Sequence, residues 1–417
     1  MSIEFRFCRA LDFYKKVFIH PLLLWKWIFT ELYSRFTLGL ILLVANLSLF
    51  ANEVKPVQVS GQEIVELHAT YFLDPSNHVT IQQLLDDSSH YQFTRSNRET
   101  LNFGPTNNAC WVHFSYQNRD TLSRFLEIAN ANLNKLDLYV VCKGRLINYL
   151  QSGLLGVNSS ETFMLNAWLL PLPTAPPGRI YDVYIRAVDQ RRVILPMKIT
   201  DLNSAIRSHH QINFHFGLYF GCLSIIAIMN IFCFAYFKER MYLYYCFHIA
   251  TQILINGILK GYLLNLFGYE FYFLSPYVPG LAGVSNIASL LFSLEFLDVR
   301  KSFPHWNKVG LSLMLLPCVG IFLNMTGFFT LSAWLGTYIG FIIIAYLFAL
   351  GLFAYKNNSK QARFYLIGWG SFLLGIIILN SALIDLLPIT GFTFNAAVFG
   401  SSLEVLLISS ALIDRVN

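Results

Sequence analysis

One segment of the chain reads FHFGLYFGCLSIIAIMNIFCFAYF, from Phe214 to Phe237, and it contains no Lys, Arg, Asp or Glu. A transmembrane helix needs about 20 consecutive apolar residues, so this segment predicts one. Further apolar runs follow toward the C-terminus, at Tyr242–Leu264, Pro276–Leu297, Val309–Met325, Leu331–Tyr355, Ala362–Leu383 and Phe392–Ile413. Together they predict an all-α bundle of seven transmembrane helices over residues 207–417.

The overall composition agrees with a membrane protein. Hydrophobic residues make up 55% of the chain and charged residues only 13%, whereas soluble proteins carry roughly 25% charged residues. The net charge is +6, but Lys and Arg form no dense run. Nucleic-acid binding is therefore not expected.

The charges between the predicted helices fix an orientation. The loops after the first, third and fifth helices and the C-terminal tail hold nearly all the cations, which are Lys238, Arg240, Arg300, Lys301, Lys308, Lys356, Lys360, Arg363 and Arg415. The opposite loops hold only Lys260. Because cytoplasmic loops are enriched in Lys and Arg, we expect a multi-pass protein of the plasma (inner) membrane with Asn417 in the cytoplasm.

The preceding residues, 52–206, then lie in the periplasm or outside the cell. Short β-branched or alternating segments, such as Cys110–Tyr116, Leu136–Val141 and Tyr181–Ala187, stand between turn signals. This pattern predicts an extracytoplasmic all-β sandwich or jelly roll. Residues 1–51 combine scattered Lys and Arg with an apolar run from Phe36 to Phe50, which predicts a signal peptide or an N-terminal anchor.

Four residues of the outer domain are candidate ligand-binding residues. Trp111 offers an aromatic face on which a sugar ring could stack, although a Trp in a strand also suits a sandwich core. Arg186, Arg191 and Arg192 could bind a carboxylate or phosphate; the alternative is that they are solvated at the surface or form a structural ion pair. Arg191 and Arg192 rank above Arg186 because they lie in a turn between two strands, where binding residues often collect.

The sequence contains few other residues that indicate a chemical function. Cys110 and Cys142 are the cysteines of the outer domain, and an oxidising compartment would permit a disulfide between them. Elsewhere there is no CxxC, no zinc-ligand spacing and no phosphate-binding loop. We therefore expect neither an enzyme nor a protein with a metal or cofactor.

Glu404 is the unusual residue of the membrane segment, because a carboxylate within a bilayer is costly and normally has a partner. Its predicted depth matches that of His248. A protonated Glu404 bonded to Ser402 or Asn380 is the alternative.

Several motifs, in this order, resemble one family. They are Cys110-Trp111-Val112-His113-Phe114, Asn134-Lys135-Leu136-Asp137-Leu138-Tyr139, Ala362-Arg363-Phe364-Tyr365-Leu366-Ile367-Gly368-Trp369 and Glu404-Val405-Leu406-Leu407. The chain is similar to the bacterial seven-transmembrane receptors with diverse intracellular signalling modules. The resemblance implies an outer jelly-roll domain like a carbohydrate-binding module. Family members continue into an output domain, whereas this sequence stops at Asn417.

The leading functional hypothesis is a receptor. A small molecule or glycan would bind the outer domain, and the bundle would signal to a separate cytoplasmic protein. The alternatives are a transporter or channel, and a non-signalling scaffold or truncated receptor. A transporter normally carries several charges within the membrane, and this chain offers mainly Glu404.

Overall fold

The computed structural model describes residues 69–416, except 87–90, 97–99, 105, 118–121, 157–161, 165, 175–178, 190–191, 358–361 and 385. These residues belong to one compact unit, Pro56–Asn417. The predicted signal peptide or anchor at residues 1–51 lies outside the described residues.

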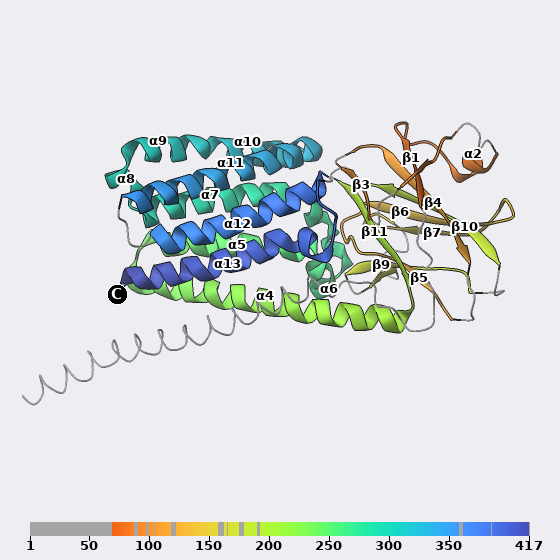
Figure 1. The fold of residues 1–417 in the computed structure, drawn as a ribbon, viewed down its shortest axis with the longest axis horizontal. Coiled ribbons are helices and arrows are strands. Elements are labelled where there is room, and N and C mark those ends of the chain that lie inside the picture. Colours follow the sequence, from red (N-terminus) through yellow and green to blue (C-terminus); the bar gives the residue numbers. More distant parts are fainter. Residues whose placement is uncertain are drawn as a thin grey trace, which may run out of the picture. The chain divides into compact units, whose positions relative to one another are not determined.

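The first part of the described chain is a β-sandwich (Figure 1). Its strands are β1 (Thr70–Asp74), β2 (Thr94–Arg95), β3 (Thr100–Gly104), β4 (Ala109–Gln117), β5 (Phe125–Ile128), β6 (Lys135–Cys142), β7 (Arg145–Ser152), β8 (Phe163–Met164), β9 (Ala167–Pro171), β10 (Ile180–Val188) and β11 (Val193–Thr200). Within the described residues one sheet has the order β2-β1-β4-β10-β6-β7 and the other β3-β11-β5-β9-β8. The strand pairs are antiparallel.

Every second side chain of the strands points into the hydrophobic core between the two sheets. In β4, Cys110, Val112 and Phe114 point into this core and are buried, because successive side chains of a strand face opposite sides. Trp111 consequently faces the outer side of the six-stranded sheet. There it packs beneath the short helix α2 (Ile81–Asp86).

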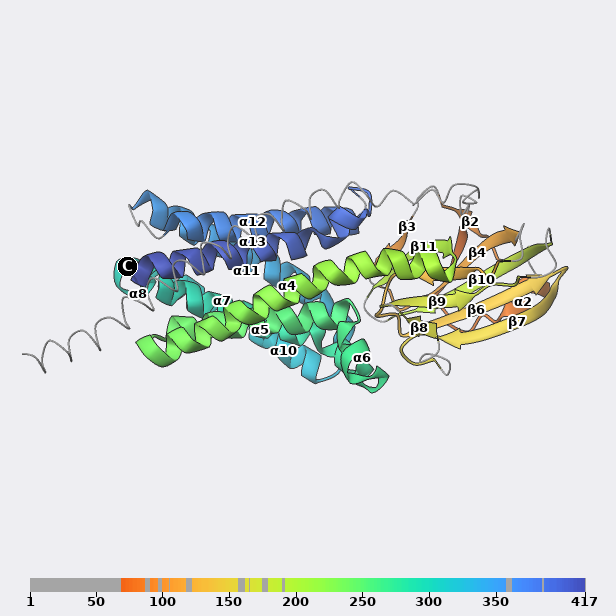
Figure 2. The same cartoon turned by 90° about the horizontal axis from the view of Figure 1, so that it is seen from below.

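The second part of the chain is helical (Figures 1 and 2). It comprises α4 (Leu202–Phe237), α5 (Arg240–Leu259), α6 (Tyr262–Phe267), the 3₁₀-helix η1 (Tyr269–Tyr277), α7 (Val278–Phe296), α8 (Val299–Ser302), α9 (Pro304–Leu313), α10 (Leu315–Met325), α11 (Phe329–Lys356), α12 (Ala362–Leu383) and α13 (Gly391–Val416).

In the part of the chain that the structure describes, one helix or two consecutive helices cover each of the seven predicted spans. Six of these helical segments are long and apolar enough to cross a membrane by length and composition, and α5 is not among the six. Polar residues such as His248, Gln252 and Asn256 lower the hydropathy of α5. The predicted fold class, a multi-domain membrane protein with an all-β sandwich followed by a helical bundle, is confirmed.

The junction between the two parts differs from the sequence-based expectation. Strand β11 ends at Thr200, and α4 begins at Leu202, whereas the sequence predicted the outer domain as far as residue 206 and the first transmembrane helix only from Phe214. The carboxylate of Asp201 caps α4 by accepting the backbone N–H of Ser204 at 3.0 Å. At 1.5 Å per residue the 36-residue helix α4 is about 54 Å long, more than the roughly 30 Å of a bilayer core.

Small residues bring α12 and α13 close together. A Cβ added to Gly375 of α12 would lie 2.4 Å from the carbonyl oxygen of Ala396, and one added to Gly400 of α13 would lie 2.6 Å from that of Ser371. Glycine is therefore required at this contact, as is common where membrane helices approach closely.

Candidate functional site

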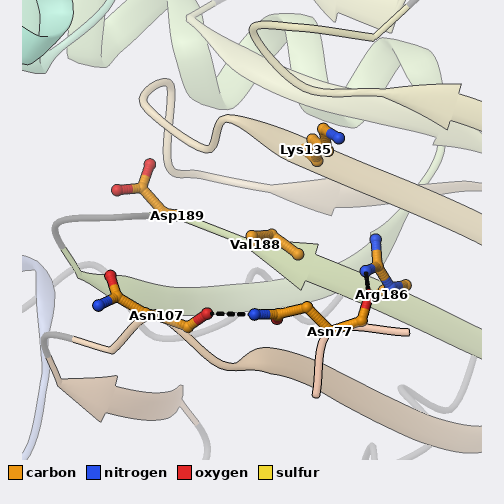
Figure 3. A pocket seen from close by; sticks show the side chains of 6 residues that line it. All are labelled: Asn77, Asn107, Lys135, Arg186, Val188 and Asp189. Atoms are coloured by element: carbon orange, nitrogen blue, oxygen red, sulfur yellow. Dashed lines mark hydrogen bonds between the residues drawn. The ribbon is translucent and has the colours of Figure 1, made fainter. Parts of the chain in front are cut away.

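A pocket of about 350 Å³ opens on the outer domain (Figure 3). Two strands and two turns supply its lining residues, which are Asn77, Asn107, Lys135, Arg186, Val188 and Asp189. Cationic, anionic and amide side chains therefore meet around one small volume.

Strand register explains how residues far apart in sequence meet there. Strands β10 and β6 are antiparallel, with Val188 opposite Lys135 and Arg186 opposite Asp137. Residues two apart in a strand share a face. Arg186, Val188 and Lys135 consequently lie on the same face, at the end of β10.

Arg186 is held from two sides. Its Nη2 donates to the carbonyl oxygen of Asn77 at 2.9 Å, and its Nη1 lies 3.6 Å from Oδ2 of Asp137. Asp137 is only 4% exposed. Burial raises the pKa of this carboxyl, although the charges of Arg186 and Lys135 oppose the rise. Within the described residues its Oδ1 has no hydrogen-bond partner.

A rigid turn presents Asn77 to the pocket. The carboxylate of Asp74 accepts the backbone N–H groups of Ser76 at 2.9 Å and of Val79 at 3.0 Å. Burial alone would raise the pKa of Asp74, but these hydrogen bonds and that of the Ser76 hydroxyl lower it overall. Asn77 takes a left-handed conformation with φ of 58°, and its Nδ2 donates to the Asn107 carbonyl at 2.8 Å.

Two residues of the outer domain, one of them close to the pocket in sequence, contact the helical bundle. Three residues after Asp189, Arg192 donates from Nη1 to the carbonyl oxygen of Leu383 at 3.2 Å, and Asn102 donates to the same oxygen at 2.8 Å. Leu383 is the last residue of α12. A cation and an amide thus satisfy an end carbonyl of this helix.

Only one of the predicted ligand-binding residues is placed in the pocket. Arg186 lines it, Arg191 lies outside the described residues, and Arg192 contacts α12 instead. Trp111 is fully buried beneath α2, with its ring stacked on Tyr139 at 5.5 Å. The prediction of Trp111 as a sugar platform is therefore wrong for this conformation, because no face of its ring reaches solvent.

The predicted disulfide is also wrong. Cys110 and Cys142 are both free thiols. Cys110 lies across β10 from Leu136, through Ala187, and Leu136 is six residues from Cys142 along β6. Six residues of strand span about 20 Å, whereas a disulfide needs Cα atoms within about 7 Å.

A second contact joins the sandwich to α4. Nε2 of His209 lies 2.9 Å from Oε1 of Glu127 in β5, and Nζ of Lys198 in β11 lies 3.1 Å from the same oxygen. Glu127 is 2% exposed. Burial by itself raises the pKa of this carboxyl, but the hydrogen bond to His209 and the charge of Lys198 outweigh it, so the pKa lies below its usual value.

The structure brings the predicted intramembrane pair together. Oε2 of Glu404 in α13 lies 3.6 Å from Nε2 of His248 in α5, and both residues are buried. This distance is longer than a hydrogen bond, and neither atom has a hydrogen-bond partner among the described residues. Tyr245 donates to the other oxygen of Glu404 at 3.3 Å, and Ser285 lies 3.0 Å from Nδ1 of His248. The alternative partners, Ser402 and Asn380, donate to carbonyls of their own helices.

The sequence-based prediction missed most of the pocket. Lys135 and Asp137 stand in a quoted strand motif, but only the β6–β10 register shows that they lie beside Arg186. For Asp137 a signal was available. It is a charged residue at a strand position that the alternating pattern places in a buried sheet. Asn77 and Asn107 lie in turns and gave no such signal.

Comparison with protein families yields two matches. The family model described as "7TM diverse intracellular signalling" matches residues 212–415, which form the bundle. The model described as "7TMR-DISM extracellular 2" matches residues 66–201, which form the sandwich. A search of curated proteins found no match.

Proposed function

Because the chain belongs to the family of seven-transmembrane receptors with diverse intracellular signalling, we propose that it is a non-enzymatic sensor that binds a small ligand in its outer pocket and signals to a cytoplasmic protein. One observation carries this proposal. Arg186 and Val188 of β10 line the pocket, and Arg192, four residues after Val188 in the sequence, donates to the carbonyl oxygen at the end of α12.

The proposed route of the signal starts at the pocket. A ligand that engages Arg186 competes with its contacts to Asn77 and Asp137, and shifts the end of β10. That shift reaches the Leu383 carbonyl through Arg192. Since α12 packs along most of α13, a displaced α12 alters the helix that contains Glu404. Transmission of this kind requires that the ligand make different contacts with two conformations of the protein.

The cytoplasmic surface that receives the partner is proposed to be the basic segment from Arg300 to Lys308, which includes the end of α8 and the start of α9. Phe303, just before α9, and Trp306, in its first turn, pack against Phe353 of α11, so they are poor reporters of a partner. His305 between them is exposed.

The test places a photo-crosslinking amino acid at His305 in native membranes. The double variant Asn102→Ala, Arg192→Gln removes both donors to the Leu383 carbonyl, and we expect it to change the yield of one specific protein crosslink at least several-fold. The matched control is Lys143→Gln in the exposed β6–β7 turn, which should leave the yield unchanged. Recovery of only lipid and self-contacts, or a yield that does not respond to the double variant, would contradict a signalling role.

A further inference from the structure

We propose that the pocket binds a small zwitterion whose ammonium and carboxylate groups lie at its two ends, such as a dipeptide. This inference rests on the proposed sensor function and specifies the ligand of the same pocket. It follows from the placement of charge, from one unpartnered acceptor atom and from the absence of aromatic rings in the described lining.

Charges of opposite sign lie at different ends of the pocket. Figure 3 shows Asp189 at one end and Arg186 at the other, with Val188 between them and Lys135 across from them. Arg186 and Asp189 are three residues apart at the end of a strand, which corresponds to about 10 Å of backbone. A ligand that meets both ends needs charged groups separated by several bonds, as the termini of a dipeptide are.

An anion without an ammonium group fits this charge pattern less well. Arg186 already has the carboxylate of Asp137 behind it at 3.6 Å, which reduces its attraction for a second anion. Asp189 is 1% exposed and accepts the backbone N–H of Asn134 at 3.3 Å through Oδ2. A dianion such as phosphate would meet repulsion from this carboxylate, because like charges in a site of low dielectric repel strongly.

One unpartnered acceptor in the lining is consistent with a ligand that carries N–H groups. Oδ1 of Asn77 is buried and has no hydrogen-bond partner among the described residues. A buried acceptor without a partner costs roughly 1–3 kcal/mol. An ammonium or peptide N–H supplies the missing donor, whereas a simple carboxylate does not.

The described lining also differs from that of a sugar site. Its apolar member is Val188, and it includes no aromatic ring. Sugar rings are commonly held by stacking on a flat aromatic face, and Trp111, the nearest candidate from the sequence, is covered by α2. A volume of about 350 Å³ is near the lower end of the range for small-molecule sites, roughly 300–1,000 Å³, and suits a ligand of dipeptide size.

Calorimetric titration of the purified full chain in lipid nanodiscs tests the ligand class. The probes are dialanine, N-acetyl-dialanine, dialanine amide, glucose and inorganic phosphate. We expect dialanine to bind, and we expect blocking either terminus to weaken binding at least tenfold. Glucose and phosphate should not compete.

Two variants test which charged residue of the pocket binds each terminus of the dipeptide. In Asp189→Asn the penalty for N-acetylation should largely disappear, and in Arg186→Gln the penalty for C-amidation should shrink several-fold. Lys143→Gln on the exposed turn is the matched control and should reproduce the original affinities. These pairings require direct contact, so a general loss of folding cannot reproduce them.

Three outcomes would overturn the ligand class: no binding of dialanine at millimolar concentration, equal affinity for the blocked and unblocked peptides, or preferential binding of glucose or phosphate. Each would leave the sensor proposal intact, because that proposal is tested by the crosslink at His305. A failed crosslink response with intact dialanine binding would instead identify a binding protein that does not signal.

Discussion

The two buried carboxylates, Glu127 and Glu404, have different environments. Glu127 accepts from His209 and from the half-exposed Lys198 in the outer domain. Glu404 lies within the bundle and meets His248 and Tyr245. In each case the partner belongs to a different element, so each carboxylate joins two parts of the chain. Removing either partner would leave a polar group buried without compensation.

Glu127 predicts acid sensitivity of the contact between the sandwich and α4. The pKa of Glu127 is lower in the folded protein than in the unfolded chain, where it is about 4.3. The ionised carboxylate therefore stabilises the fold fully at pH values above the unfolded pKa. The stabilisation is lost as the pH falls through the lower, folded pKa. We expect the melting temperature of the purified protein to fall below about pH 4 more steeply than in Glu127→Gln.

The Glu127→Gln variant should itself lose about 1.5–3 kcal/mol of stability at pH 7, the usual contribution of a hydrogen bond to a charged group. Glu239→Gln, at an exposed position before α5, is the control and should match the original protein at each pH. Parallel pH profiles for the original protein and Glu127→Gln would show that the carboxylate has no such role.

The intramembrane pair predicts coupling between α5 and α13. Unfolding free energies should be measured for Glu404→Gln, His248→Ala and the double variant. We expect the double variant to cost less than the sum of the single changes by about 0.5–3 kcal/mol, because each single change leaves one polar group without its partner. As a control, Glu404→Gln combined with a change at the exposed His305 should be additive. Strict additivity of the first pair would rule out the interaction.

At the scale of helices, the contact of α12 with α13 depends on glycine. We expect Gly375→Ala to lower the unfolding free energy by about 1–3 kcal/mol, because its Cβ would overlap a backbone oxygen that cannot move alone. Gly336→Ala in α11 is the matched control, since a Cβ there meets nothing within 4 Å. The control should leave the unfolding free energy unchanged or raise it slightly, as expected for Ala in place of Gly in a helix. Equal stability of the two variants would show that the helices are not closely packed.

The sequence predicted the helical passes well because a long apolar run has one common explanation. Phe214–Phe237, for example, falls entirely within α4. The predicted pairing of Glu404 with His248 also followed from a simple count of residues into the bilayer. The N-terminal extension of α4 was missed, because residues such as Arg207 and His210 resemble a polar linker rather than a helix that continues beyond the membrane.

The site was predicted less well than the fold, and the reason is physical. Arg186 was identified by its charge alone, but its partners are set by the pairing of β10 with β6 and by the turn that holds Asn77. Such non-local pairings leave no mark in the local sequence. Trp111 shows the same limit, because the sequence indicated a Trp in a strand but not that α2 covers the face of the sheet on which it lies.

For the whole molecule, the ends of the bundle can be compared with the orientation that the sequence predicts. Asn102 and Asn132 of the sandwich donate to the carbonyls of Leu383 and Leu259, which end α12 and α5. The basic residues follow α4, α7 and α11, whose C-terminal ends are the opposite end of the bundle. The sandwich and the positive charges therefore belong to opposite ends, as the positive-inside rule requires.

This arrangement predicts the result of reporter fusions. A reporter that is active only in the periplasm should work when fused at Gly268, between α6 and η1, and should be silent when fused after Asn417. A reporter active only in the cytoplasm serves as the control and should give the reverse pattern. Activity of the periplasmic reporter at the C-terminus would invert the assigned orientation.

The burial of Trp111 has an optical consequence. The strand register places Trp111 directly beside Arg186, in a dry environment beneath α2, and its indole Nε1 has no hydrogen-bond partner among the described residues. Indole emission responds to nearby electric fields, so a charged molecule that arrives next to Arg186 should change the colour of Trp111 fluorescence. The difference in emission between the original protein and Trp111→Phe would isolate this signal. The chain therefore contains an intrinsic fluorophore on the strand next to Arg186.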